Sequence, residues 1–434
     1  MTTSRPGEIT RLYGTAPDTG RDGLWAELRE RHGPVAPVEL ETGVRAWLLL
    51  GYHENLAVLR NQHLFSRDTR RWREAAYARP AISWRPNALY ADGAEHVRLR
   101  SAITDSLARV DMNATARTIR RIADELIDSF AARGRADLIT EYAHPLPVLV
   151  VNSLYGLPDS YGHMLGDLTS IVFAENADRA EDAVSRIQQY FSELVARKHR
   201  RPGLDLVSWM LEHPAGLSDH EVAHQAALIH NASHQPTTHL IGNTLHTLLT
   251  DTGIRMAYTE ARLPVQELLD HVMWTDTPFR IMPARIALQD TRIGGAEIRA
   301  GDALLLGFDA AHHDPAVRRD GGGKRAHLLF GAGAHSCPAQ ELARMITATA
   351  VTALQERLAG IRLAVAPGEL RWVWSPFLRG LRELPVTFTP DAPAAPPPRR
   401  PAEAPETPED ERGGGDEEGD LLGRLLDWWR GLRA

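Results

Sequence analysis

The residues whose types could do chemistry gather around the only cysteine of the chain, Cys337. It follows a run of glycine and alanine at 331–334, and Phe330, Gly333 and Cys337 have the spacing F-x-x-G-x-x-x-C. Small residues allow a tight turn whose backbone amides point at the sulfur, and such hydrogen bonds tune a metal that is bound to a thiolate. The spacing therefore predicts one sulfur ligand for one metal ion. The alternative is a buried free cysteine that packs as a small apolar side chain.

This run resembles the haem-binding loop of the cytochrome P450 superfamily, the haem-thiolate oxygenases. The resemblance covers about residues 10–388 and implies a mainly α-helical fold with small β-sheets and a long central helix over the haem. It implies haem b as the cofactor, Cys337 as the iron ligand, and Phe330 and Gly333 in the loop that holds the haem. It also implies a monooxygenase of bacterial secondary metabolism that oxidises a small or medium apolar metabolite, with electrons from a ferredoxin and its reductase.

Four further residues match positions that hold the two haem propionates in this family: His96, Arg100, Arg285 and His335. His96 and Arg100 are four residues apart, so they share one face if the segment is helical. Arg285 leads into a strand-like run, and His335 stands two residues before Cys337. Buried carboxylates need paired donors of this kind. The alternative for His96 and Arg100 is an ordinary exposed basic face of a helix.

The oxygen-activating segment departs from the family pattern A/G-G-x-D/E-T-T, because the chain reads A-S-H-Q-P-T at 232–237. Gln235 replaces the acid and Pro236 replaces the threonine. Gln235 cannot titrate, and Pro236 has neither a hydroxyl nor a backbone N–H. Thr237 offers a hydroxyl, although each residue turns a helix by about 100°, so this hydroxyl points elsewhere. His234 is the nearby group whose ordinary pKa suits proton transfer. These four residues are the candidate catalytic set.

A second departure concerns the E-x-x-R motif, which in the family ties the core to the loop near the cysteine. The favoured register starts at Asp270 and places Met273 where the arginine belongs, and the alternative starts at Glu267. The arginine is missing in both registers, and an atypical actinobacterial branch of the family that the chain resembles also lacks it. The arginines that we expect to reach Asp270 instead are Arg318, Arg319 and Arg325.

The elements that position these residues can be predicted from caps and periodicity. Ser218 and Glu221 form a capping-box pattern that opens a helix running to about Thr250, which is roughly 48 Å at 1.5 Å per residue. The pattern at 285–306 is strand-like. Pro338 can begin a helix, and the helical spacing continues over 340–358.

Composition limits the class of protein. The chain has 434 residues, 43% of them apolar, and a formal net charge of −7. One cysteine excludes a disulfide framework, and the absence of a basic excess argues against nucleic-acid binding. No apolar run reaches transmembrane length and the first residues lack the apolar core of a signal peptide, so we expect a cytoplasmic protein.

The chain divides into three parts by composition. Residues 1–388 form one globular unit, the haem-thiolate domain. Residues 389–419 are rich in proline and acidic residues and cannot bury a core, which predicts a disordered linker. Residues 420–434 predict a short amphipathic helix with leucine and tryptophan on one stripe. Such a helix is suited to docking a protein partner or to resting on a membrane surface, and the alternative is that it folds back on its own domain or stays disordered.

Three hypotheses for function follow. The first is a dioxygen-dependent monooxygenase. The second is a peroxide-using peroxygenase, because some family members that use hydrogen peroxide also carry proline at the threonine position. The third is a haem-binding signalling or scaffold protein that has lost turnover, which the unusual tail favours. The substrate is not fixed by the sequence, and we expect its contacts in the segments 66–92, 164–186 and 374–380.

Overall fold

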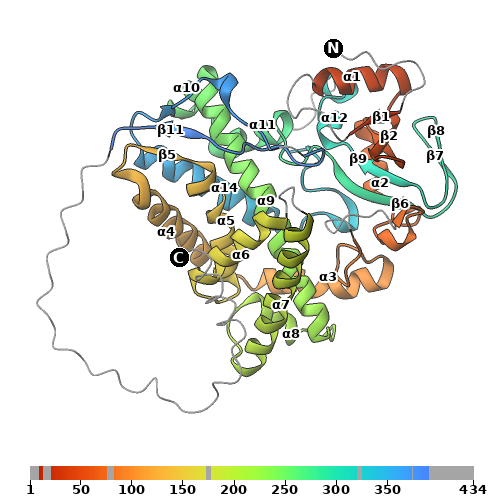
Figure 1. Ribbon diagram of the computed structural model, residues 1–434, viewed down its shortest axis with the longest axis horizontal. Helices are drawn as coiled ribbons and strands as arrows, with labels where there is room; N and C mark the ends of the chain where they lie inside the picture. The colour runs from red at the N-terminus through yellow and green to blue at the C-terminus, as the bar shows by residue number, and fades with distance from the viewer. Residues whose placement is uncertain are drawn as a thin grey trace, which may run out of the picture.

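The computed structural model describes residues 9–12, 21–75, 83–172, 177–319, 325–373 and 375–390. Most of its helices gather on one side of the molecule, and its largest sheet lies on the other with α1 (Arg21–His32), α2 (Tyr52–Arg60) and α12 (Phe308–His312) beside it (Figure 1). The long helix α9 (Asp219–Thr250) runs through the helical side. The predicted class, mainly helical with small sheets, is confirmed.

The other α-helices are α3 (Gly93–Ala108), α4 (Met112–Ala131), α5 (Pro145–Leu154), α6 (Asp159–Val172), α7 (Ala177–Arg200), α8 (Leu206–Leu211), α10 (Thr252–Thr259), α11 (Val265–Thr275), α13 (Pro315–Arg319) and α14 (Gln340–Arg357). Helix α14 therefore begins where the sequence predicts and ends one residue earlier.

The largest sheet has six strands in the order β1-β2-β3-β9-β6-β4. Their bounds are β1 (Thr10–Arg11), β2 (Val35–Glu41), β3 (Val44–Leu49), β4 (Phe65–Ser66), β6 (Met282–Ala287) and β9 (Ala303–Leu306). Strands β3 and β9 pair in parallel with Trp47 opposite Leu304, and β6 pairs antiparallel with β9 so that Arg285 also lies opposite Leu304. The strand-like pattern at 285–306 is thus confirmed, and it carries Arg285 into the sheet.

Two smaller sheets complete the strands. The first has the order β10-β11-β5, from Arg362–Leu363, Pro385–Thr387 and Arg135–Asp137. The second is the hairpin of β7 (Thr291–Ile293) and β8 (Ala296–Ile298).

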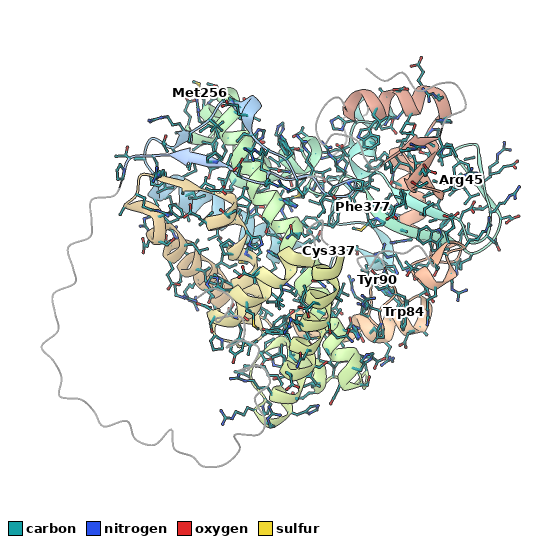
Figure 2. The ribbon with its side chains drawn as sticks, in the orientation of Figure 1. Arg45, Trp84, Tyr90, Met256, Cys337 and Phe377 are labelled. Carbon is teal, nitrogen blue, oxygen red and sulfur yellow. The ribbon has the colours of Figure 1, made fainter. Side chains whose placement is uncertain are left out.

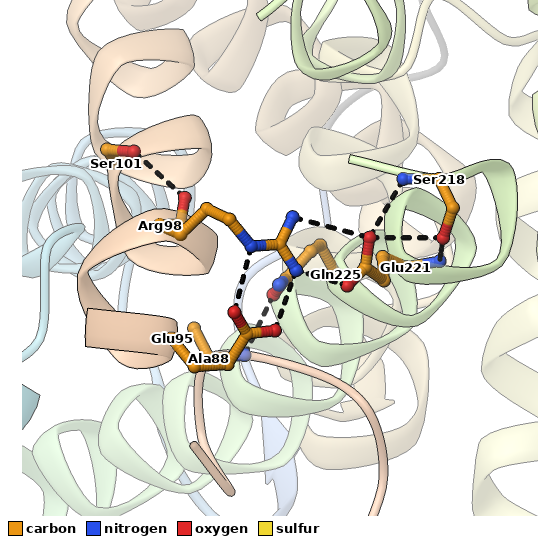
Figure 3. Close-up of polar contacts among 7 residues, drawn as sticks. All are labelled: Ala88, Glu95, Arg98, Ser101, Ser218, Glu221 and Gln225. Atoms are coloured by element: carbon orange, nitrogen blue, oxygen red, sulfur yellow. Dashed lines mark hydrogen bonds and ion pairs between the residues drawn. The ribbon is translucent and has the colours of Figure 1, made fainter. Parts of the chain in front are cut away.

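The start of α9 is fixed by its cap and by a neighbouring helix (Figure 3). The Ser218 hydroxyl accepts from the Glu221 amide at 3.3 Å, and the Glu221 carboxylate accepts from the Ser218 amide at 2.8 Å. This is the predicted capping box. Arg98 of α3 lies between two carboxylates and forms ion pairs with both, Glu95 on its own helix and Glu221 on α9. The contact ties α3 to the first turn of α9.

Helix α9 lies at the boundary of two apolar clusters. The larger cluster joins α4, α5, α11 and α14 to the C-terminal half of α9, through residues such as Leu240 and Leu245. The second joins α3, α6, α7 and α8 to its N-terminal half, through Val222 and Ala226. Packing against both clusters fixes the position of α9. The side chains on the part of α9 that neither cluster covers are therefore held in fixed positions relative to the rest of the domain.

The predicted linker and C-terminal helix, 389–419 and 420–434, lie outside the described residues apart from the first two positions. Thr389 still belongs to the ordered body, since its amide donates to the Ala359 carbonyl at 2.8 Å. Within the described part of the chain, no helix combines the length and the apolar character needed to cross a membrane.

Candidate functional site

The Cys337 loop is a closed turn that leads directly into α14. The Cys337 amide donates to the Phe330 carbonyl at 2.8 Å, and the Gly331 amide donates to the Leu328 carbonyl at 2.8 Å. Gly331 and Gly333 have φ values of 68° and 72°, which favour glycine. The two bonds and the two left-handed positions explain why the small residues occur where they do.

Gly333 is also required by its neighbour. A Cβ atom at this position would lie 2.7 Å from the backbone carbonyl oxygen of Leu59, at the end of α2. The loop therefore rests directly on the backbone of α2, and a side chain at Gly333 would push the two apart.

The thiol of Cys337 lies near the centre of the molecule (Figure 2). Burial raises its pKa, while a hydrogen bond from the Ala339 backbone and the charge of Arg100 act in the opposite direction. Both opposing groups stabilise a negative sulfur, as does the N-terminal end of α14, which begins at Gln340. The surroundings thus contain the donors that a thiolate needs, and burial keeps the free thiol protonated.

The predicted propionate partners come together beside this loop. His96 on α3 and His335 have ring centroids 4.0 Å apart. Among the described residues, the Nε2 atoms of both rings are buried without a hydrogen-bond partner, and so is Nη1 of Arg285. Three buried polar atoms without a hydrogen-bond partner are unusual in a folded protein. His335 Nε2 has a carboxylate nearby, Asp92 Oδ1, but at 3.8 Å, beyond hydrogen-bond distance. The Arg100 guanidinium differs, because it donates to the Ser336 carbonyl and so holds the loop itself.

Two residues of this cluster were not predicted. Arg67 is buried and donates to the carbonyl of Pro283 at 2.8 Å, two residues before Arg285 in β6. Asp92 accepts from the Ser66 hydroxyl and from the Arg67 amide, the latter at 3.1 Å. No motif marks either position. The pairing of β4 with β6 brings Arg67 to the site, and Asp92 is the residue directly before α3, the helix that carries His96.

The charges of the cluster favour an anionic ligand. Burial lowers the pKa of Arg67 to about 10 and that of Arg285 well below its usual range. Asp92 is the nearby carboxylate. Burial opposes its ionisation, but His335 and the hydrogen bonds from Ser66 and Arg67 bring its pKa down to about 2. One carboxylate does not balance three neighbouring arginines, of which Arg100 is the third, and a buried cation needs a partner. A ligand with carboxylates fits this cluster.

The middle of α9 has one open strip. Asn231 and Ala232 are exposed and Gln235 and Pro236 are half-buried, although the residues before and after are packed on both apolar clusters. The helix continues through Pro236. Since proline has no N–H, the Ala232 carbonyl loses its helical donor and stays available to a water or a ligand.

The other two members of the candidate catalytic set lie on the buried side of α9. Thr237 is buried, and His234 is fully buried with its ring edge-on to His144, the residue before α5, at 4.5 Å between centroids. Burial, followed by the nearby His144 and His230, lowers the pKa of His234 well below 6.5. His234 is therefore neutral at pH 7 and does not share the strip of Gln235 and Pro236.

Asp270 lies on the buried side of α11, and its close partner was not predicted. Arg344 of α14 approaches it with Nη1 2.6 Å from Oδ1. Of the three expected arginines, Arg325 lies 3.8 Å away with a mostly exposed side chain. The side chains of Arg318 and Arg319 lie outside the described residues. Arg344 was not predicted as a partner because it lies in α14, more than seventy residues after Asp270 in the sequence.

Comparison with known proteins agrees with this geometry. The chain is 30% identical to the cytochrome P450 monooxygenase PikC of Streptomyces venezuelae, over 84% of this chain and 90% of that protein. The chain belongs to the cytochrome P450 superfamily. It is 29% identical to 6-deoxyerythronolide B hydroxylase of Saccharopolyspora erythraea, over 86% of this chain and 98% of that protein. No protein-family model matches the chain.

Solved P450 structures share the fold. The myxobacterial CYP267B1 in complex with myristic acid has a TM-score of 0.76 and 27% identity, over 85% of this chain and 96% of that one. CYP154C4 from Streptomyces sp. W2061 has a TM-score of 0.78 and 26% identity, over 87% and 97%. The chain is thus a haem-dependent P450 monooxygenase, a class that oxidises small molecules and receives electrons from redox partners. The predicted family and enzyme class are confirmed.

Proposed function

We propose that this P450 binds haem b with Cys337 as the iron ligand and oxidises a small or medium apolar metabolite. The observation that carries the proposal is the glycine turn of Cys337 beside three buried nitrogen atoms without a hydrogen-bond partner, on His96, His335 and Arg285. Bound haem supplies the oxidising chemistry. The residues of this chain bind it, set the charge around it and orient the substrate.

The propionates have a defined place in this proposal. His96, Arg285 and His335 have buried donor atoms without acceptors, and Arg100 lies beside them. Phe330 and Gly333 fix the turn that presents the sulfur, and the Ala339 amide donates to it. Each donor that the ligand satisfies removes an unfavourable buried polar group, so binding is expected to stabilise the whole loop.

The oxidant is proposed to be dioxygen, with electrons from a ferredoxin and its reductase, as the family's redox partners suggest. A peroxygenase is the second candidate, and the open strip of α9 favours it. Asn231, Ala232, Gln235 and Pro236 carry no titratable side chain, and His234 is neutral on the other side. A proton must therefore come through water, for which the Ala232 carbonyl offers a hydrogen-bond acceptor.

The substrate class is proposed from the relatives and the open strip. Relatives include 6-deoxyerythronolide B hydroxylase and vitamin D(3) 25-hydroxylase. We place substrate contacts in 66–92, 164–186 and 374–380, and the protein in the cytoplasm. The C-terminal helix at 420–434 is proposed to dock a protein partner or a membrane surface. The third hypothesis, a signalling or scaffold role, requires absence of turnover.

The test compares two oxidant systems on one protein. Purified holoprotein is incubated with macrolactone, steroid and fatty-acid probes, either with NADPH, ferredoxin and reductase or with hydrogen peroxide alone. Products that gain one oxygen atom only in the first system support the monooxygenase. Robust product with peroxide alone supports the second candidate, and turnover in neither system supports the scaffold role. A pyridine haemochrome spectrum identifies haem b in the same sample.

A further inference from the structure

Arg344 is a buried cation whose guanidinium contacts three residues on one face of α11: Gln266, Asp270 and Met273. Nη1 lies 2.6 Å from Asp270 Oδ1, although this approach lies off the direction of a hydrogen bond. Nε donates to Gln266 Oε1 at 3.1 Å, and Nη2 donates to the Gln266 carbonyl at 3.2 Å. The exposed fractions are 5% for Arg344 and 4% for Asp270. This is a desolvated ion pair with supporting hydrogen bonds rather than a surface contact.

The guanidinium of Arg344 takes the place of the missing helical arginine. Met273 stands three residues after Asp270, where E-x-x-R has its arginine, and the Met273 sulfur is 3.8 Å from Arg344 Nη1. Gln266, Asp270 and Met273 share one face of α11 because their spacings are four and three residues. The charge therefore reaches Asp270 from the facing helix, and the uncharged Met273 fills the space beside it.

The position of this pair relates it to Cys337. Arg344 lies in the second turn of α14, directly after the loop. On the other arm of the loop, His327 Nε2 is 3.9 Å from Asp270, and the His327 ring is 5.7 Å from the Phe330 ring. Asp270 is thus approached by the chain both before and after the cysteine.

We propose that Arg344 is a positioning residue that replaces the arginine missing from α11, and that Asp270 and Arg344 together fix the Cys337 loop. The proposal rests on Cys337 being the iron ligand. Removing Asp270 leaves the Arg344 cation buried without its carboxylate. Removing Arg344 leaves the buried Asp270 carboxylate with only the mostly exposed Arg325, 3.8 Å away, among the described arginines, and both changes are strongly unfavourable. The structure relieves the uncompensated charge by loosening α11 from α14, and this movement would displace the sulfur.

The first test is a charge swap read from the reduced carbon monoxide spectrum of the holoprotein. Arg344→Met is expected to lose most of the red-shifted thiolate band to a shorter-wavelength band. Arg344→Met with Met273→Arg returns the cation to Asp270 from its own helix and should recover at least half of the band. The matched control is Arg357→Met, which removes a partly exposed ion pair with Asp128 from the same helix, and it should keep the wild-type spectrum.

A wild-type band in Arg344→Met, or failure of the swap to recover any band while far-ultraviolet circular dichroism stays native, would overturn the proposal. A second measurement needs no variant. In native-state hydrogen exchange of the wild type at low urea, residues 328–339 should open in one step with α11 and the first turns of α14. Independent opening of the loop contradicts the proposal. Should the wild type itself lack the thiolate band, the role of Cys337 fails, and hydrogen exchange still decides the role of Arg344.

Discussion

At the scale of single residues, the site is defined by buried nitrogen atoms without a hydrogen-bond partner and by buried arginines that outnumber the nearby carboxylates. The family resemblance gave His96, Arg100, Arg285 and His335 as one group, although they are far apart in the sequence, and the structure brings them beside Cys337. Their roles toward haem remain proposals, supported by buried atoms without acceptors. Arg67 and Asp92 could not be predicted, because nothing in their local sequence distinguishes them from ordinary surface residues.

Arg285→Met is predicted to change two quantities in opposite directions. It removes a buried cation, so the free energy of unfolding of the haem-free protein should rise. It also removes a donor to a propionate, so haem affinity should fall by about 1.5–3 kcal/mol. Chemical unfolding of the haem-free form and a haem titration measure the two effects. The exposed Arg292→Met serves as control, and a change of the same sign in both quantities would contradict the proposed role.

Restoring the family pair is predicted to change coupling rather than binding. Gln235→Glu with Pro236→Thr supplies an acid and a hydroxyl on the open strip of α9, and it returns the amide that the Ala232 carbonyl lacks. The fraction of NADPH electrons recovered in product should rise several-fold, with little change in probe affinity. Unchanged coupling would show that protons reach the site without these positions.

At the scale of elements, local signals were sufficient where a helix begins and insufficient where elements meet. The Ser218 capping box and the start of α14 follow from neighbouring residues, and both were predicted. The parallel pairing of Trp47 with Leu304 and the contact of Arg344 with Asp270 join distant segments. Such contacts depend on how helices and strands pack. The closest partner of Asp270, Arg344, was therefore not predicted, although the predicted Arg325 also lies 3.8 Å from Asp270.

The contact between the Cys337 loop and α2 gives a prediction at this scale. Gly333→Ala places a methyl group 2.7 Å from the Leu59 carbonyl at a φ of 72°. We expect a loss of about 1–3 kcal/mol in unfolding free energy from backbone strain, with weaker haem retention. Gly368→Ala is the matched control, since it has an ordinary φ and open space around it. Equal stability of the two variants would show that the loop does not rest on α2.

At the scale of the whole molecule, the helical side and the largest sheet meet around Cys337 (Figures 1 and 2). Family and fold class could be predicted from the sequence because the cysteine spacing is specific. The described interior is unusual in its buried imidazoles, which are His96, His224, His230, His234, His239, His312 and His327.

These imidazoles predict acid sensitivity. Burial is the first cause that lowers their pKa values, for example to about 3 in His230 and about 4 in His239. The unfolded chain binds more protons below its ordinary histidine pKa of about 6.5, so this stability is complete above pH 6.5 and is lost as pH falls toward 4. Urea unfolding between pH 7 and 4.5 measures the slope. His230→Gln should flatten it, and the exposed His53→Gln should not. Equal slopes in both variants would contradict the assignment.

The absorption spectrum of the dithionite-reduced protein with carbon monoxide tests most directly whether Cys337 is the haem ligand. Wild-type protein should show a strongly red-shifted Soret band, because a thiolate supported by the Ala339 amide and Arg100 is expected to face the iron. Cys337→Ser should lose this band while keeping the native circular dichroism spectrum. A red-shifted band that persists in Cys337→Ser, or a wild-type band at the shorter wavelength of a neutral-thiol or histidine-bound haem, would contradict the account.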